Sequence, residues 1–155
     1  MAVYLVQHGL SLPKDEDPER GLSEAGIADV KRIAAVAKGY EVPVASIFHS
    51  GKKRARQTAE IFASALNPGS GVTEMTGLSP MDDVQVFSKN LSPQDKDNRM
   101  FVGHLPFMEK LTAFLITRDE KRPVFQFQNG GIVCLGQYGD QGGWVIKWTL
   151  MPHIH

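Results

Sequence analysis

Short apolar runs alternate along the chain with stretches of helical periodicity, and this alternation constrains the fold more than any other feature. The runs are rich in β-branched and aromatic residues, which favour strands, and they are too short to form helices. Alternating strands and helices predict an α/β domain with a mainly parallel sheet and helices on both faces, a three-layer sandwich. The expected strands are residues 3–6, 46–49, 72–75, 100–102, 131–136 and 143–150, and the expected helices are 23–39, 53–66, 82–90 and 106–116.

The length and the charge balance set limits on domain number and partners. A chain of 155 residues fits a single domain over residues 1–155. Seventeen Lys and Arg residues balance seventeen Asp and Glu residues. This balance argues against broad binding to nucleic acid or to a membrane surface, which needs an excess of basic residues. No apolar run approaches the roughly 20 residues of a membrane helix, and the N-terminus lacks the basic region of a signal peptide. We therefore expect a cytoplasmic protein.

Cysteine and histidine usage gives no sign of a metal site or cofactor. Cys134 is the single cysteine, so neither an intrachain disulfide nor a thiolate cluster can form. It lies in an apolar strand, which predicts that its thiol is buried as a small hydrophobic group. His153 and His155 are expected to lie in a solvated tail, and we expect no metal and no cofactor.

Three expected strands end in polar residues that suit an anion. His8 follows the first strand, Ser50 follows the second, and His104 follows a later one. In open parallel sheets ligands bind beyond the carboxyl ends of the strands, so these side chains are predicted to meet in one pocket. Arg54 falls in the first turn of a helix, whose N-terminus already favours an anion. Each of these signals is weak alone, and their combination predicts an anion site.

The same residues resemble the motifs of the histidine phosphatase superfamily, also called phosphoglycerate-mutase-like. The family pattern has Arg-His-Gly after the first strand, Leu-Thr/Ser-x-x-Gly at a helix start, Ser-Pro-x-x-Arg-Ala-x-Gln-Thr-Ala, and Gly/Ser-His-x-Pro. The matching stretches occur in the same order at residues 7–9, 22–26, 50–59 and 103–106. The short length, with no room for a helical cap, is similar to the small phosphohistidine phosphatase branch. The resemblance implies the phosphoglycerate-mutase-like α/β fold.

The resemblance also implies roles for individual residues. His8 is the implied nucleophile, forming a phosphohistidine intermediate, while Arg54 and a protonated His104 hold the phosphoryl oxygens. The substrate-binding residues that it implies are Gln7, Gly9, Arg20 and Ser50. A neutral imidazole is a suitable nucleophile near pH 7, because its ordinary pKa is about 6.5. The implied enzyme is a phosphatase that needs no metal.

The sequence departs from the family pattern at positions that bear on activity. Gln7 stands where the family has arginine, which removes a cation from the site, and Arg20 is a candidate to compensate partly. Gly51 replaces a proline. The position of the family's general acid matches Gly77, and the nearby carboxylates Glu74, Asp82 and Asp83 are expected to be solvated. A site without an acid can still release imidazole, whose pKa is near neutrality, but it is poorly suited to an alkoxide.

Three functions therefore remain open at this stage. The leading hypothesis is a phosphohistidine phosphatase acting on a phosphorylated protein, for example a histidine phosphotransfer domain. The second is a phosphatase of a small activated phosphate compound. The third is a degenerate member that binds phosphorylated ligands without turnover, which Gln7 makes plausible.

Overall fold

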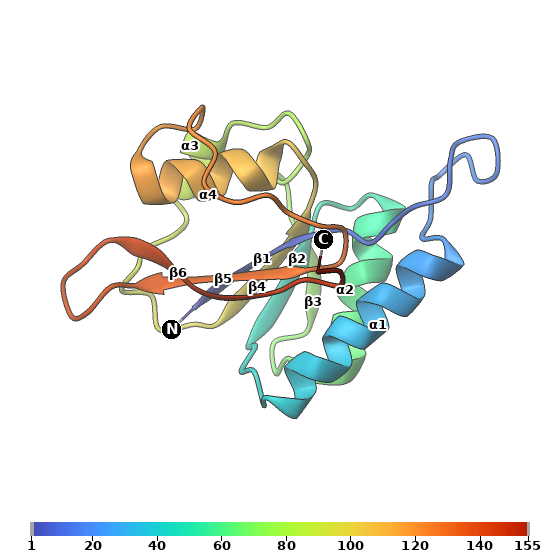
Figure 1. Cartoon of the computed structure of the whole chain (residues 1–155), viewed down its shortest axis with the longest axis horizontal. Coiled ribbons are helices and arrows are strands. Elements are labelled where there is room, and N and C mark those ends of the chain that lie inside the picture. Colours follow the sequence, from blue (N-terminus) through green and yellow to red (C-terminus); the bar gives the residue numbers. More distant parts are fainter. Residues whose placement is uncertain (1, 155) are drawn as a thin grey trace.

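The computed structural model describes residues 2–154. Its centre is a six-stranded sheet with the strand order β3-β2-β4-β1-β5-β6 (Figure 1). β1, β2, β3 and β4 are parallel to one another, whereas β5 runs antiparallel to β1 and β6 antiparallel to β5. The sequence-based expectation of a mainly parallel sheet is therefore confirmed. The strands are β1 Val3–Gln7, β2 Ser46–His49, β3 Val72–Glu74, β4 Arg99–Gly103, β5 Ile132–Gln137 and β6 Trp144–Leu150.

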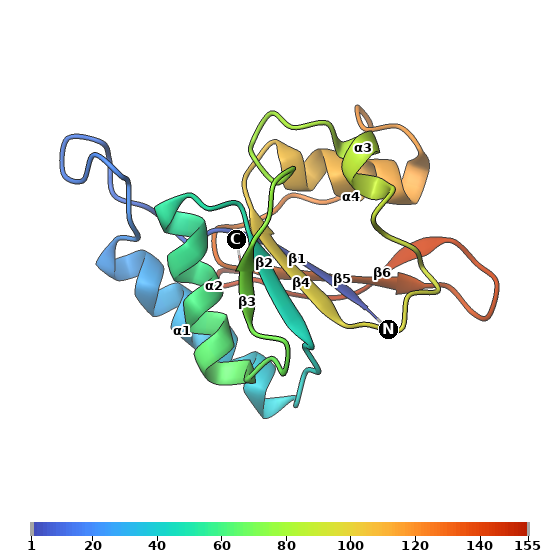
Figure 2. The same cartoon turned by 180° about the vertical axis from the view of Figure 1, so that it is seen from behind.

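The helices cover the sheet on both faces, as expected. They are α1 Glu24–Gly39, α2 Lys53–Leu66, α3 Val84–Ser88 and α4 Phe107–Thr117. α1 and α2 lie on one face and α3 and α4 on the other (Figures 1 and 2). Successive residues of β1 point to opposite faces, so Tyr4 and Val6 join the core under α1 and α2, while Val3 and Leu5 join the core under α3 and α4. Because both faces are covered, β1 is apolar throughout its buried length.

Local signals set the ends of the helices. The Ser23 side chain accepts a hydrogen bond from the Gly26 nitrogen at 3.0 Å and caps α1, as predicted. α2 has the predicted bounds and ends at Asn67, whose φ of 48° lies in the left-handed region. α3 is shorter than the expected 82–90, because the Asp83 carboxylate caps it and the helix begins at Val84.

Cys134 is buried in β5, as predicted, and packs in the core under α1 and α2. Burial raises the pKa of its thiol to about 11. Within residues 2–154 no helix has the length and apolar character that crossing a membrane requires.

The register of the parallel strands brings their carboxyl ends level. Gln7 of β1 lies beside Gly103 of β4, and His49 of β2 lies beside Val102. The residues that follow these three strands therefore emerge side by side at one edge of the sheet, where α2 begins.

Candidate active site

His8, Arg54 and His104 converge at this edge. The His8 backbone nitrogen donates to the Gly103 oxygen at 2.9 Å, which sets His8 next to the end of β4. The rings of His8 and His104 lie with their centroids 5.0 Å apart. Arg54, in the first turn of α2, donates from Nε to His8 Nε2 at 3.3 Å. The structure thus brings together the three residues for which the sequence predicts the central roles.

The hydrogen bonds of His8 define its tautomer. Nδ1 lies 2.7 Å from the Gly9 carbonyl oxygen, which can only accept, so Nδ1 carries the proton. Nε2 then holds the lone pair, which is consistent with its acceptance of the Arg54 N–H. The nitrogen that lies closest to the arginine is therefore the one able to act as a nucleophile.

The backbone around His8 is tied to two other segments. Thr58 of α2 accepts from the Gly9 nitrogen at 2.9 Å through its Oγ1 and donates from the same atom to the Arg54 oxygen at 2.8 Å. The Asn129 side chain donates to the His8 oxygen at 2.9 Å, and the Gly130 nitrogen donates to the Gln7 oxygen at 2.9 Å. These bonds hold the backbone at His8 in place and so set the orientation of its imidazole ring.

His104 is 1% exposed, and its surroundings bear on its charge. Nε2 lies 2.6 Å from the Ser50 Oγ, while Nδ1 is buried and has no hydrogen-bond partner among the described residues. Desolvation, with His8, Arg54 and Lys52 adding to it, lowers its pKa to about 3. The resemblance implied a protonated His104 on a phosphoryl group, and in the structure the imidazole is neutral at pH 7. A dianionic ligand would favour its protonation.

The pKa of His8 is lowered as well, to about 4. Desolvation is the largest cause, Arg54 and Arg20 lower it further, and the bond to the Gly9 carbonyl opposes them. Burial also lowers the pKa of Arg54, with Arg20 contributing. The site therefore concentrates positive potential around a neutral nucleophile, an arrangement that suits an anionic substrate.

A polar cavity of about 460 Å³ opens above these groups. Gln7 and Arg20 both line it, so the position that lacks the family's arginine and the candidate replacement border the same cavity. The Oε1 of Gln7 and the Nε of Arg20 are buried without hydrogen-bond partners among the described residues. The complete lining is Gln7, His8, Leu10, Ser11, Arg20, Arg54, Pro80, His104, Leu105 and Asn129.

Two expected substrate-binding residues do not line the cavity. Gly9 is buried, its N–H is occupied by Thr58, and a Cβ there would lie 2.7 Å from a Val30 methyl group. Gly9 is thus needed for packing against α1 and not for a close approach of ligand. Ser50 contacts His104 instead of the cavity, so its hydroxyl orients that ring.

None of the residues lining the cavity within 2–154 is a carboxylate. Asp82 accepts a hydrogen bond from the Ser79 nitrogen, Asp83 caps α3, and Glu74 is an exposed residue of β3. The position matched to the family's general acid, Gly77, has a φ of 91°. The sequence predicted that these carboxylates are solvated and lie outside the active site, and none of them lines the cavity.

Sequence reasoning missed Thr58 and Asn129. Thr58 lies inside the matched Gln-Thr-Ala stretch, so the motif itself was the available signal. Asn129 lies in the loop between α4 and β5, where no pattern in the sequence distinguishes it from an ordinary turn residue.

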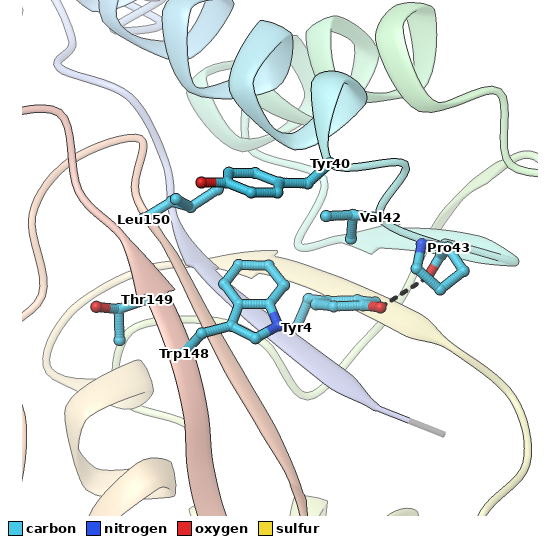
Figure 3. Close-up of a pocket in the computed structure, with 7 residues that line it drawn as sticks. All are labelled: Tyr4, Tyr40, Val42, Pro43, Trp148, Thr149 and Leu150. Atoms are coloured by element: carbon cyan, nitrogen blue, oxygen red, sulfur yellow. Dashed lines mark hydrogen bonds between the residues drawn. The ribbon is translucent and has the colours of Figure 1, made fainter.

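A second hollow, of about 510 Å³, lies between β6 and the segment that follows α1 (Figure 3). Its walls are mainly apolar and aromatic, and the buried Tyr4 hydroxyl donates to the Pro43 oxygen at 2.7 Å. No charged side chain lines it within the described part of the chain. It lacks the groups that phosphoryl transfer requires, so the polar cavity beside His8 is the candidate active site.

Comparison with known proteins identifies the family and the fold. The family model described as histidine phosphatase superfamily (branch 1) matches residues 3–82, just over half of the 155-residue chain. The solved structure of the protein histidine phosphatase SixA complexed with tungstate has a TM-score of 0.82 and 25% identity, covering 98% of this chain and 97% of that one. SixA from Agrobacterium tumefaciens has a TM-score of 0.71 and 26% identity, with 97% of each chain covered.

More distant structures share the fold. Phosphoserine phosphatase from Entamoeba histolytica, in complex with 3-phosphoglyceric acid, has a TM-score of 0.68 and 16% identity, covering 96% of this chain and 95% of that one. A comparison with curated protein sequences found no match.

Proposed function

The chain belongs to the histidine phosphatase superfamily, and on that premise we propose that it hydrolyses a protein phosphohistidine through a phosphohistidine intermediate on His8. The observation that supports this most is the pairing of a neutral His8 Nε2 with Arg54 at 3.3 Å in a cavity also lined by Arg20 and His104. The lone pair of His8 and the side chains that can bind an anion then face the same cavity.

The first chemical step is an in-line attack. His8 Nε2 forms a bond to phosphorus as the bond from phosphorus to the substrate's imidazole nitrogen breaks. The substrate ring carries a proton on its other nitrogen, so it leaves with the bonding electron pair as neutral imidazole. Arg54 and Arg20 hold the non-bridging oxygens through charge-assisted hydrogen bonds. His104 becomes a donor when the dianion raises its pKa. Catalysis of this kind rests on positioning and on charge stabilisation.

The second step returns the enzyme to its starting state. Water attacks the phosphorus, the bond to His8 Nε2 breaks, and inorganic phosphate is released with the water's oxygen. The proton lost by the water passes to the departing phosphate or to solvent. The Nδ1–H of His8 remains bonded to the Gly9 carbonyl throughout, which keeps Nε2 as the reacting atom.

The cavity lining favours a nitrogen leaving group over an alkoxide. An alkoxide is strongly basic and must receive a proton as it leaves, which is the task of a carboxylic acid in a phosphatase of alkyl esters. No carboxylate lines the cavity in residues 2–154. A phosphohistidine ring that is protonated on its other nitrogen releases neutral imidazole, whose conjugate acid has a pKa near neutrality, and it needs no such help.

The open cavity also suits a protein substrate. A phosphohistidine side chain carries its polypeptide with it, and the lining residue Leu10 is 49% exposed, so part of the cavity wall lies at the molecular surface. We therefore propose a phosphorylated protein, such as a histidine phosphotransfer domain, as the substrate. A small activated phosphate compound is the alternative substrate of the same site.

Gln7 favours one further possibility, that the chain binds phosphate without turnover. A hydrogen bond from a charged donor contributes about 1.5–3 kcal/mol, against about 0.5–1.5 kcal/mol for a neutral one. Replacing the family's arginine by Gln7 therefore slows phosphoryl transfer by roughly ten- to a hundredfold unless another cation compensates. Arg20 lies in the same cavity and is our candidate for that cation.

The test is a comparison of two substrates. The chain is incubated separately with a phosphohistidine-containing phosphotransfer domain and with p-nitrophenyl phosphate, and phosphate release is followed for each. The proposal expects faster release from the phosphohistidine protein, and no release above background from a His8→Ala variant. Binding of phosphate without release from either substrate would identify a binding protein. Preference for p-nitrophenyl phosphate, whose leaving group is also weakly basic, would overturn the phosphoprotein as substrate in favour of a small activated phosphate compound.

A further inference from the structure

Arg20 reaches the cavity from a backbone conformation that non-glycine residues rarely adopt. Its φ is 53°, within the left-handed region. Such a conformation is unfavourable for a residue with a Cβ unless the surrounding structure imposes it. Arg20 lies in the loop between β1 and α1, which extends away from the body of the protein in Figure 1. Some feature of this loop must hold the arginine in place.

Asp17 accepts hydrogen bonds from the amides on both sides of Arg20. Its Oδ1 accepts from the Glu19 nitrogen at 3.0 Å and its Oδ2 from the Gly21 nitrogen at 2.8 Å. The Asp17 backbone oxygen accepts from the Arg20 nitrogen at 2.9 Å. Three successive N–H groups therefore point at one residue, which closes the chain into the turn that Arg20 occupies.

The same carboxylate ties the turn to the helix that carries Arg54. Asp17 Oδ2 lies 2.9 Å from Lys53 Nζ, and Lys53 immediately precedes Arg54 in α2. The Asp17 side chain is 18% exposed, whereas that of Glu19, the other acid near Lys53, is 77% exposed at a distance of 3.8 Å. Lys53, Gly21 and Glu19 together hold the pKa of Asp17 at about 2, so it is ionised at neutral pH.

A second contact fixes the end of the turn against α2. The Leu22 nitrogen donates to Gln57 Oε1 at 2.7 Å, one helical turn beyond Lys53. A Cβ on Gly21 would lie 2.9 Å from Asp17 Oδ2, 2.9 Å from Lys53 Cε and 3.1 Å from Gln57 Oε1, so the turn packs closely on α2. The loop that carries Arg20 is therefore attached to α2, the helix that also carries Arg54.

We propose that Asp17 is a positioning residue, which holds Arg20 at the cavity in a fixed relation to Arg54 so that both guanidinium groups reach the same anion. The proposal rests on the proposed function only for the identity of that anion. It makes Asp17 act through Arg20, and this dependence can be measured.

The charge on His8 gives a readout that does not depend on activity. The groups that act on the His8 ring are Arg54, Arg20 and His104, and the nearby Arg20 lowers the pKa of His8. Removing a carboxylate from the neighbourhood would by itself lower that pKa, because it removes negative charge. A rise of the His8 pKa in Asp17→Ala therefore means that Arg20 has moved away or that water has reached the ring, and the Arg20→Ala background separates the two, because only entry of water would raise the pKa further there.

The experiment compares Asp17→Ala, Arg20→Ala and the double variant by NMR titration of His8 and by kcat/KM on the phosphohistidine protein. We expect both single variants to raise the His8 pKa and to lower kcat/KM by roughly ten- to a hundredfold. The double variant should match Arg20→Ala alone in both measurements, because Asp17 has nothing left to position. Asp17→Asn, which retains an acceptor oxygen and loses the ion pair, should fall between wild type and Asp17→Ala, and it serves if Asp17→Ala does not fold.

Asp15→Ala is the matched control. Asp15 is an exposed acid in the same loop, and its side chain accepts no hydrogen bond from residues 2–154 that the structure records. It should leave both readouts unchanged. An unchanged or lowered His8 pKa in Asp17→Ala, or losses that add in the double variant, would overturn the proposal. If wild type releases no phosphate, the proposed function fails, while the titrations still decide the role of Asp17.

Discussion

Arg54 Nε lies 3.3 Å from His8 Nε2, and in this contact the lone pair of the imidazole faces the guanidinium group. An arginine beside a histidine normally opposes protonation of the ring, and here it adds to the effect of burial. Burial, with Arg54 adding to it, thus keeps the proposed nucleophile neutral, and Arg54 is also the group that we propose to bind the phosphoryl oxygens.

Replacing His8 by alanine should abolish phosphate release, because no other side chain in the cavity offers a nucleophile with the same geometry. We expect activity on the phosphohistidine protein to fall below about a hundredth of wild type. The unfolding temperature, measured in parallel, should remain close to that of wild type, since the fold does not depend on this ring. Activity above that level would remove His8 from the role of nucleophile.

Replacing Gln7 by arginine should raise kcat/KM by about tenfold or more, because a charged donor replaces a neutral one on the cavity wall. The same change in an Arg20→Ala background should restore part of the loss, since the two positions line the same cavity. Steady-state kinetics and phosphate affinity are measured for all four proteins. A rate and an affinity that both stay unchanged would show that residue 7 does not touch the phosphoryl group. Tighter binding without any turnover would instead identify a binding protein.

Acidification below pH 6.5 should destabilise the fold through the histidines whose pKa is lowered by desolvation, among them His8 and His104. The pKa is lowered to about 4 for His8 and to about 3 for His104, so between these values and about 6.5 the unfolded chain binds more protons than the folded one. The free energy of unfolding therefore rises with pH in this window, by up to roughly 1.4 kcal/mol per pH unit for each histidine. Urea denaturation at pH 7 and pH 5.5 measures the difference. A His8→Asn variant should show a shallower dependence, and equal stability at both pH values would contradict the burial argument.

Replacing Gly26 by alanine should be strongly destabilising, because an added Cβ would lie 2.1 Å from the Leu10 carbonyl oxygen. Backbone cannot yield as a flexible side chain can, so α1 would have to move away from the loop that follows His8. We expect a loss of about 2 kcal/mol or more in the free energy of unfolding, and reduced activity, since Leu10 lines the cavity.

Gly39 provides the control for that change, because it lies at the end of the same helix and a Cβ there meets nothing within 4 Å. Gly39→Ala should leave stability unchanged or raise it by up to about 1 kcal/mol through the better helix propensity of alanine. Equal effects at the two positions in thermal or urea unfolding would show that the close approach of Gly26 to Leu10 is not what requires glycine.

The parts of the fold that could be predicted are those fixed by local pattern. The bounds of α2, the cap at Ser23 and the burial of Cys134 all follow from periodicity, capping chemistry or an apolar neighbourhood. The convergence of His8, Arg54 and His104 could be predicted because carboxyl ends of parallel strands meet at one edge. α3 was predicted too long, because the sequence does not show that the Asp83 carboxylate turns back to cap it.

What could not be predicted depends on tertiary contacts. Gly9 was expected to bind substrate. Instead, its N–H donates to Thr58 and the residue packs on Val30, so it does not line the cavity. Ser50 was expected to bind substrate, and its contact is with His104. The left-handed conformation of Arg20 is set by hydrogen bonds to Asp17, which no periodic pattern announces.

The strand order has a consequence for how the protein is made. β1 is synthesised first but lies in the interior of the sheet, and both of its neighbours, β4 and β5, come from the later half of the chain. On the ribosome its buried residues must therefore wait, unpaired, until residues 99–137 have emerged. Contacts between such distant segments are slow to form, because loop closure precedes the gain from pairing. His8 reaches His104 only when β1 has paired with β4, so the return of phosphatase activity during refolding would report this long-range pairing and not the formation of any single helix.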